Sequence, residues 1–181
     1  GWAPDTYAFA PPLSSAILSG IISKSYIFVL IKFFYRVIGM DVIVSQQITP
    51  FLFICGVSGM IIGSILAISQ RDIRRMIAYS SVAQIGYIYM GLGIGTDAGV
   101  EAALFQMLVH AAVKSLLFLS AYELINVSGD RKRFRYLHGA GYRNVPAGIV
   151  FTIAAMSMVG IPFTGGFIVK LNLAISGIAM G

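Results

Sequence analysis

The sequence predicts an all-α polytopic membrane protein with about five transmembrane helices, because apolar stretches long enough to cross a bilayer recur along it. Hydrophobic residues make up 57% of its 181 residues and charged residues only 11%, whereas soluble domains average about 25% charged residues. The mean hydropathy is +0.84. Most basic residues gather in short clusters between apolar stretches, as in membrane proteins. We therefore expect one transmembrane bundle over residues 1–181, surrounded by lipid.

A helix that crosses a bilayer needs roughly 20 mostly apolar residues. Four stretches are predicted as single spans: Ser14–Tyr35, Thr49–Ser69, Ile73–Leu92 and Val100–Ile125. A fifth begins near Val145 and continues towards Met180. At about 1.5 Å per residue, this fifth stretch is too long for one straight crossing.

The motif GIPFTGG interrupts the fifth stretch and contributes Gly160, Pro162, Gly165 and Gly166. Proline removes a backbone donor from a helix, and glycine favours conformations that end one. We predict a broken last helix, and two separate spans joined at this point are the alternative. In transporters, broken helices expose backbone groups to a polar cavity where ions bind.

The distribution of basic residues predicts the orientation. The link before the third span carries Arg71, Arg74 and Arg75, and the link after the fourth carries five more Lys and Arg within residues 131–143. The opposite links, residues 37–48 and 93–99, contain neither Lys nor Arg. The positive-inside rule then places the basic links and the amino terminus in the cytoplasm. The net charge of +6 is thus interpreted as a topology signal, and no nucleic-acid partner is expected.

Basic residues within the spans are the candidate functional groups, since a charge at the bilayer centre costs at least about 2.5–3.5 kcal/mol. Lys24 lies near the middle of the first span, flanked by Ser23 and Ser25. Lys32 and Arg36 lie near the end of that span, where a long side chain reaches the membrane surface. Lys24 is therefore the functional candidate, and Lys32 is a possible residue of a channel mouth.

Gln106, His110 and Lys114 follow one another at four-residue spacing in the fourth span. Residues with this spacing lie on one face of a helix. A buried histidine is often only a hydrogen-bonded core residue, but a lysine on the same face favours a proton-handling role, because two cations are costly to bury together. Glu123, near the end of the same span, is a possible residue of the cytoplasmic channel mouth.

Lys170 follows the predicted break, and this position marks it as a fourth functional candidate. The sequence contains no glycine-rich phosphate loop, no Cys/His metal spacing and no nucleophile triad. We expect no catalytic residue, no cofactor and no metal. Ser80 and Ser81 are interpreted as packing residues, because small side chains let membrane helices approach closely.

Three motifs in order, RDIRRMIAYSSVAQIGY, HAAVKSLLFLSA and GIPFTGGFIVK, resemble the antiporter-like proton-channel subunits of respiratory complex I. The same family includes subunits of multisubunit cation/proton antiporters and of membrane-bound hydrogenases. The opening GWAPDTYAFAPPLSSAILSG is similar to the start of the family's eighth helix, and the resemblance covers nearly the whole chain. It implies helices eight to twelve, which form one five-helix repeat of a subunit built from two inverted repeats. The chain begins without methionine or signal peptide, as if inside a protein, and a piece of a longer subunit, a processed product and one half of a split gene are the alternatives.

The resemblance also implies a role for each candidate. Lys24 matches the lysine that connects two half-channels, His110 and Lys114 match the central basic pair of the second half-channel, and Lys170 matches the lysine of the broken helix near the outer exit. The missing first repeat would then be a partner, because it carries the other half-channel.

The resulting hypothesis is a proton-translocating subunit with a relay through Lys24, His110, Lys114 and Lys170, in that order. It would serve a redox-driven complex such as NADH:quinone oxidoreductase in a prokaryotic cytoplasmic or organellar inner membrane. Partner membrane subunits would perform the redox chemistry. One alternative is a subunit of a Na⁺ or K⁺/H⁺ antiporter or of a membrane-bound hydrogenase. Another is a structural membrane subunit with no conduction of its own.

Overall fold

The computed structural model describes residues 2–178, so the predicted end of the last span at Met180 lies outside the described residues. Within that range the chain is helical and has no β-strand, which confirms the all-helical fold class. The longer helices and their bounds are α3 Ser23–Phe33, α5 Ile48–Ile68, α6 Ile73–Gly93, α7 Asp97–Asn126, α9 Val145–Val159 and α10 Gly165–Ile178. The shorter ones are α1 Trp2–Phe9, α2 Pro12–Ile17, α4 Met40–Ser45 and α8 Ala140–Arg143.

The first span is longer and less regular than predicted. α2 and α3 join through the π-helical turn Leu18–Ile22, and a second π-helical turn, Phe34–Ile38, extends α3. The whole helix covers Pro12–Ile38, or 27 residues. It begins at a proline, whose fixed φ suits the first helical turn. It ends at Gly39, whose φ of +87° favours glycine.

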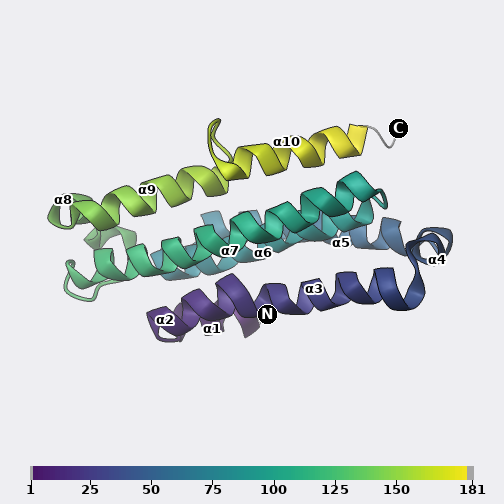
Figure 1. Cartoon of the computed structure of the whole chain (residues 1–181). Coiled ribbons are helices and arrows are strands. Elements are labelled where there is room, and N and C mark those ends of the chain that lie inside the picture. The colour runs from purple at the N-terminus through teal and green to yellow at the C-terminus, as the bar shows by residue number, and fades with distance from the viewer. Residues whose placement is uncertain (1, 179–181) are drawn as a thin grey trace.

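α7 is the central helix of the bundle (Figure 1). α9 and α10 run along one side of it, α2 and α3 run along the other, and α5 and α6 lie behind it. Half of its most apolar stretch is buried inside the bundle, compared with 17% for α5. α7 therefore presents side chains to nearly every other long helix.

Three helical stretches of the described residues are long and apolar enough to cross a membrane: Pro12–Ile38, Ile48–Ile68 and Asp97–Asn126. α6 has 21 residues but is less apolar and mostly buried. α9 and α10 have 15 and 14 residues, which is about 22 and 21 Å of helix, and each is shorter than the roughly 30 Å of a bilayer core. Figure 1 shows α9 and α10 nearly in line and running along α7, an arrangement that suits one interrupted crossing. The number of crossings stays a prediction.

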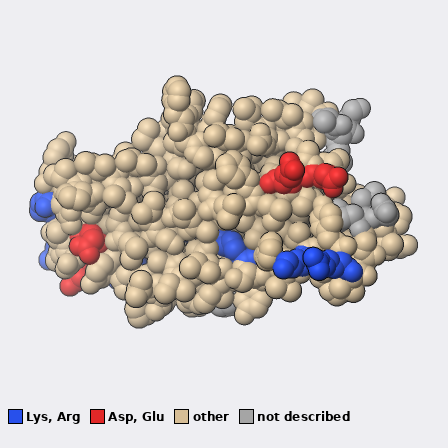
Figure 2. Space-filling view, in the orientation of Figure 1, with Lys and Arg blue, Asp and Glu red and all other residues tan. Residues whose placement is uncertain are grey.

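The surface is suited to lipid. Large apolar side chains such as Ile54, Ile61 and Ile65 of α5 are exposed. On the face shown in Figure 2, charged atoms lie at the left end and on the right-hand side, a smaller blue patch lies near the middle, and uncharged residues cover most of the rest.

The two basic links lie side by side. The amide of Ile73 donates to the carbonyl of Lys132 at 3.1 Å, and the amide of Phe134 donates to the carbonyl of Arg71 at 3.2 Å. Asp72 begins α6 by accepting from the amides of Arg74 and Arg75. The prediction that both links share one side of the membrane agrees with this pairing.

Candidate functional site

Three side chains on one face of α7, Gln106, His110 and Lys114, lie inside the bundle, and we call them the α7 stripe. Gln106, His110 and Lys114 are 2%, 1% and 0% exposed, so all three are buried between helices. Each points from the same face of α7, as four-residue spacing requires. The hydrogen-bond partners of Gln106 and Lys114 come from α6.

Lys114 is bound by oxygen atoms of α6. Its Nζ donates to the carbonyl of Ile77 and to the Oγ of Ser80, the latter at 2.7 Å. Ser80 in turn donates to the carbonyl of Ile77 at 2.9 Å. A buried ammonium needs such partners, because leaving it without hydrogen bonds would cost several kcal/mol.

Lys24 is 6% exposed and lies directly after the first π-helical turn. Its Nζ donates to the carbonyl of Ser19 and to the Oγ of Ser23 at 3.2 Å. The turn packs tightly on α7, since a Cβ at Gly20 would stand 3.2 Å from the carbonyl oxygen of Ala111. This close approach brings Lys24 towards the α7 stripe.

Serine side chains join the two lysines. The Oγ atoms of Ser19 and Ser81 are 3.2 Å apart, and Ser81 donates to the same Ile77 carbonyl that accepts from Lys114. We call Lys24, Ser19, Ser81, Ser80 and Lys114 the lysine–serine network. The interpretation of Ser80 and Ser81 as packing residues left out these hydrogen bonds, which the sequence motif alone does not reveal.

His110 lies between charged groups but has no hydrogen bond. Among the residues that the structure describes, neither of its ring nitrogens has a partner. Lys24 and Lys114 are both close enough to act on it electrostatically. The structure thus brings three of the four predicted relay residues together.

Lys170 occupies the break between α9 and α10. Its Nζ donates to the carbonyls of Met158 at 3.0 Å and Val159 at 2.6 Å, and it lies 5.2 Å from the ring centroid of Tyr87. These carbonyls belong to the last turn of α9, where the partial negative charge of a helix favours a cation. Lys170 therefore caps α9 from α10.

The predicted helix-breaking residues lie at this cap. Gly160 ends α9 with a φ of +87°, and Pro162 is exposed between the helices. Gly165 begins α10 beside the side chain of Val109. A Cβ on Gly166 would collide with the carbonyl oxygen of Ser157, so only glycine allows this close approach.

Two glutamines connect the cap to the stripe. Gln106 donates to Gln84 at 2.6 Å, and Gln84 approaches the carbonyl of Met158 at 3.5 Å, the carbonyl that also accepts from Lys170. Lys170 is consequently linked to the Gln106 end of the stripe. Hydrogen bonds thus join Lys24 to Lys114 and Gln106 to Lys170, and among the described residues His110 belongs to neither network.

The two possible mouth residues lie apart from this centre. Glu123 is exposed near the end of α7, in a groove that Asn144 and Pro146 also line. Lys32 is exposed, with its Nζ 5.0 Å from the ring centroid of Phe28. Within residues 2–178, no group of three His, Cys, Asp or Glu residues is arranged as a metal site would require.

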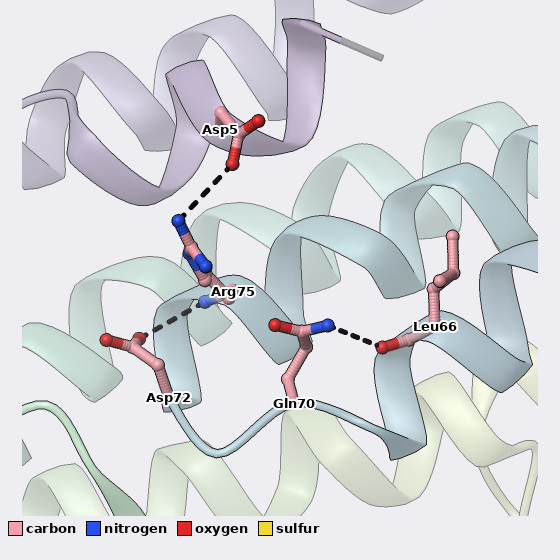
Figure 3. A network of polar contacts seen from close by, with 5 residues as sticks. All are labelled: Asp5, Leu66, Gln70, Asp72 and Arg75. Carbon is pink, nitrogen blue, oxygen red and sulfur yellow. Dashed lines mark hydrogen bonds and ion pairs between the residues drawn. The ribbon is translucent and has the colours of Figure 1, made fainter.

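A buried arginine that sequence reasoning treated only as a topology signal holds the amino-terminal segment. Arg74 is 7% exposed and donates to the carbonyls of Tyr7 and Ala10 and to the Oγ of Ser15. Its neighbour Arg75 forms an ion pair with Asp5 of α1 at 3.6 Å (Figure 3). α1 is thereby fixed to the start of α6.

Comparison with known proteins identifies the family. Residues 1–181 match the family described as "NADH:quinone oxidoreductase/Mrp antiporter, TM". The chain belongs to this family. Its match to the antiporter-like family agrees with the resemblance carried by the three sequence motifs.

Individual members of the family show how much of a subunit this chain represents. NADH-quinone oxidoreductase subunit N of Desulforudis audaxviator (strain MP104C) is 35% identical over 184 residues, which cover 100% of this chain and 36% of that protein. A chain of the membrane-bound sulfane sulfur reductase, an archaeal respiratory membrane complex, superposes with a TM-score of 0.88 at 30% identity, over 97% of this chain and 35% of its own length. A chain of the Mrp complex from Dietzia sp. DQ12-45-1b gives a TM-score of 0.81 at 27% identity, over 100% of this chain and 33% of its own. The chain thus spans about a third of the length of these relatives.

Proposed function

We propose that this chain forms part of the proton path of an antiporter-like subunit in a redox-driven membrane complex. The path would run through Lys24 and Lys114, across His110, to Lys170. The observation that carries the proposal is the buried His110, which has no hydrogen-bond partner within residues 2–178 and lies between two hydrogen-bonded networks that each end in lysine. A histidine in that position is the group that accepts a proton from one side and donates it to the other.

Hydroxyl groups support conduction between the two lysines of the lysine–serine network. A serine hydroxyl both donates and accepts, so Ser19 and Ser81 can reverse the direction of their hydrogen bond as a proton passes. An ammonium has three donors and no acceptor, and it must lose a proton before it can accept one. The alternation of lysine and serine is therefore suited to stepwise transfer.

The energies involved are of the right size for coupling. Moving one elementary charge across 100 mV requires about 2.3 kcal/mol. One hydrogen bond to a charged group is worth about 1.5–3 kcal/mol. Rearrangement of a single hydrogen bond at Lys114 or Lys170 would therefore be enough to favour or oppose a transfer step.

We further propose that the end of the bundle with the paired basic links faces the cytoplasm, with the amino terminus on the same side. Other membrane subunits would be the partners and would provide the redox energy, and the remaining repeat of the subunit would complete the path. NADH-quinone oxidoreductase subunit N and the archaeal respiratory complex support this assignment by their similarity.

Cation/proton antiport is the second candidate, and the structural similarity to the Mrp complex favours it. The oxygen atoms that bind Lys24, Lys114 and Lys170 are carbonyls and hydroxyls, and each already accepts a hydrogen bond from an ammonium group, whose positive charge would repel Na⁺ or K⁺. We therefore rank proton translocation first. Dependence of transport on Na⁺ or K⁺ would reverse this ranking.

The test is proton pumping by the intact complex in reconstituted vesicles, with Lys114→Ala and Lys170→Ala in the complete subunit. Loss of a proton-transfer group should slow pumping by about 10²-fold or more. Arg36→Ala is the control, because Arg36 is exposed and lies outside both networks, and it should pump normally. Undiminished pumping in both central variants would refute the path and favour a structural subunit.

A further inference from the structure

A pair of buried amides separates His110 from Lys170. Gln106 of α7 is 2% exposed and Gln84 of α6 is 7% exposed. The Nε2 of Gln106 donates to the Oε1 of Gln84 at 2.6 Å, so the two amides are in direct contact. We call these two residues the glutamine pair.

The position of the pair is set by three helices. Gln106 lies one helical turn before His110 on the same face of α7. Gln84 approaches the carbonyl oxygen of Met158, in the last turn of α9, at 3.5 Å. Because Lys170 donates to that same oxygen at 3.0 Å, the hydrogen bonds that lead from the α7 stripe to Lys170 run through the glutamine pair.

The chemistry of the pair opposes proton transfer. A primary amide donates and accepts hydrogen bonds but does not take up or release a proton near neutral pH. When the two amides bond directly to each other, their side chains also occupy the space that a bridging water would need. The network around Lys24 and Lys114 has the opposite character, since it is built of hydroxyls and amines.

We propose that the glutamine pair is a gate that closes the proton path between His110 and Lys170. The gate opens when the end of α9 shifts, because the carbonyl of Met158 contacts both Gln84 and Lys170 and ties the pair to the helix break. Separation of the two amides lets water enter between them, and water completes the connection. This inference rests on the proposed proton path.

Two substitutions at one position separate a gate from a structural contact. Gln106→Ala removes the amide and leaves space for water, so the closed state should leak protons. Gln106→Met keeps a side chain of similar length but offers no polar group to hold a water chain. The closed state of this variant should therefore not leak protons, and the open state should conduct them poorly. A merely structural hydrogen bond would give both variants the same defect.

The experiment uses the intact complex in vesicles and two readouts: decay of an imposed pH gradient without substrate, and the initial rate of driven pumping. Gln106→Ala and Gln84→Ala should raise the passive decay by about tenfold, as expected for loss of a contact worth about 1.4 kcal/mol. Gln106→Met should slow driven pumping by about tenfold without raising the decay. Gln70→Ala is the control, since this glutamine only donates to the carbonyl of Leu66 at 3.0 Å in the α5–α6 link (Figure 3).

The outcomes distinguish the gate from the path itself. A Gln106→Met variant that assembles and pumps at the wild-type rate overturns the gate, and so do assembled Ala variants that do not leak. Lys114→Ala, measured in the same series, tests the path. If that variant loses pumping while the glutamine variants behave as wild type, the proposed function stands and the gate is wrong.

Discussion

At the scale of single residues, the lysines of the proposed path are held by neutral oxygen atoms. Lys24 and Lys114 donate to backbone carbonyls and serine hydroxyls, and Lys170 donates to the last carbonyls of α9. A carboxylate partner would hold the proton of a lysine by an ion pair in a low dielectric, where such attraction is strong. Neutral partners solvate the ammonium without binding its proton so tightly, which suits a group that has to release it.

Ser80 provides a test of this solvation. Ser80→Ala removes one of the two oxygens that bind the Lys114 ammonium, a hydrogen bond to a charged group worth about 1.5–3 kcal/mol. We expect the rate of driven proton pumping to fall by about tenfold, and the amount of assembled complex to stay normal, because alanine fits the site. Ser58→Ala is the control, since Ser58 is exposed on α5 and donates only to the carbonyl of Cys55. Equal pumping in both variants would show that Ser80 contributes only packing.

The sequence predicted the residues of the α7 stripe but not their partners. Four-residue spacing places Gln106, His110 and Lys114 on one face, whatever surrounds the helix. The partners Ser80 and Gln84 depend on how α6 is rotated about its axis against α7, and a local pattern does not contain that information.

At the scale of helices, the break between α9 and α10 is the feature that positions Lys170. α9 ends with carbonyls that no later turn of the helix can satisfy, and Lys170 satisfies two of them. The close approach of Gly166 to the carbonyl of Ser157 keeps α10 beside that end. A substitution at Gly166 should therefore disturb the break without touching a charged residue.

Gly166→Ala is expected to destabilise the protein by about 1–3 kcal/mol, because the new methyl group would overlap the backbone of α9. Thermal unfolding of the purified complex is the measurement. Gly177→Ala, in the same helix, is the control, since a Cβ there meets nothing within 4 Å. Equal stability of the two variants would mean that α9 and α10 separate without cost.

The sequence predicted where the long helices lie more readily than it predicted irregular turns within them. The apolar runs around Ser14–Tyr35 and Val100–Ile125 predicted two long helices, and the structure contains both with later ends. The π-helical turn Leu18–Ile22 was not predicted, because it depends on how Gly20 packs against α7. The motif GIPFTGG, in contrast, carries its own local signal, and the helix interruption lies at its residues.

At the scale of the whole molecule, the two basic links meet at one end of the bundle through the backbone contacts between residues 71–73 and 132–134. The acidic residue Asp97 begins α7 at the other end, where it accepts from the hydroxyl of Tyr35 at 3.3 Å. This charge asymmetry is the physical basis for the proposed orientation.

Orientation can be measured with cysteine labelling in a background where Cys55 is replaced by serine. Arg135→Cys lies in a basic link and Asp97→Cys lies at the opposite end, and both positions are exposed. A membrane-impermeant maleimide should label Arg135→Cys only in inside-out vesicles and Asp97→Cys only in right-side-out vesicles. The reverse pattern would invert the bundle and place the basic links outside.

The central claim is that protons pass through His110, and the His110→Leu variant of the complete subunit tests it most directly. Because the His110 ring nitrogens have no partner among the described residues, leucine should cost no protein hydrogen bond there, and the complex should assemble. The measurement is the initial rate of substrate-driven proton uptake by reconstituted vesicles, per assembled complex. The proton path predicts a loss of about 10²-fold or more. A wild-type rate in an assembled His110→Leu complex would contradict it.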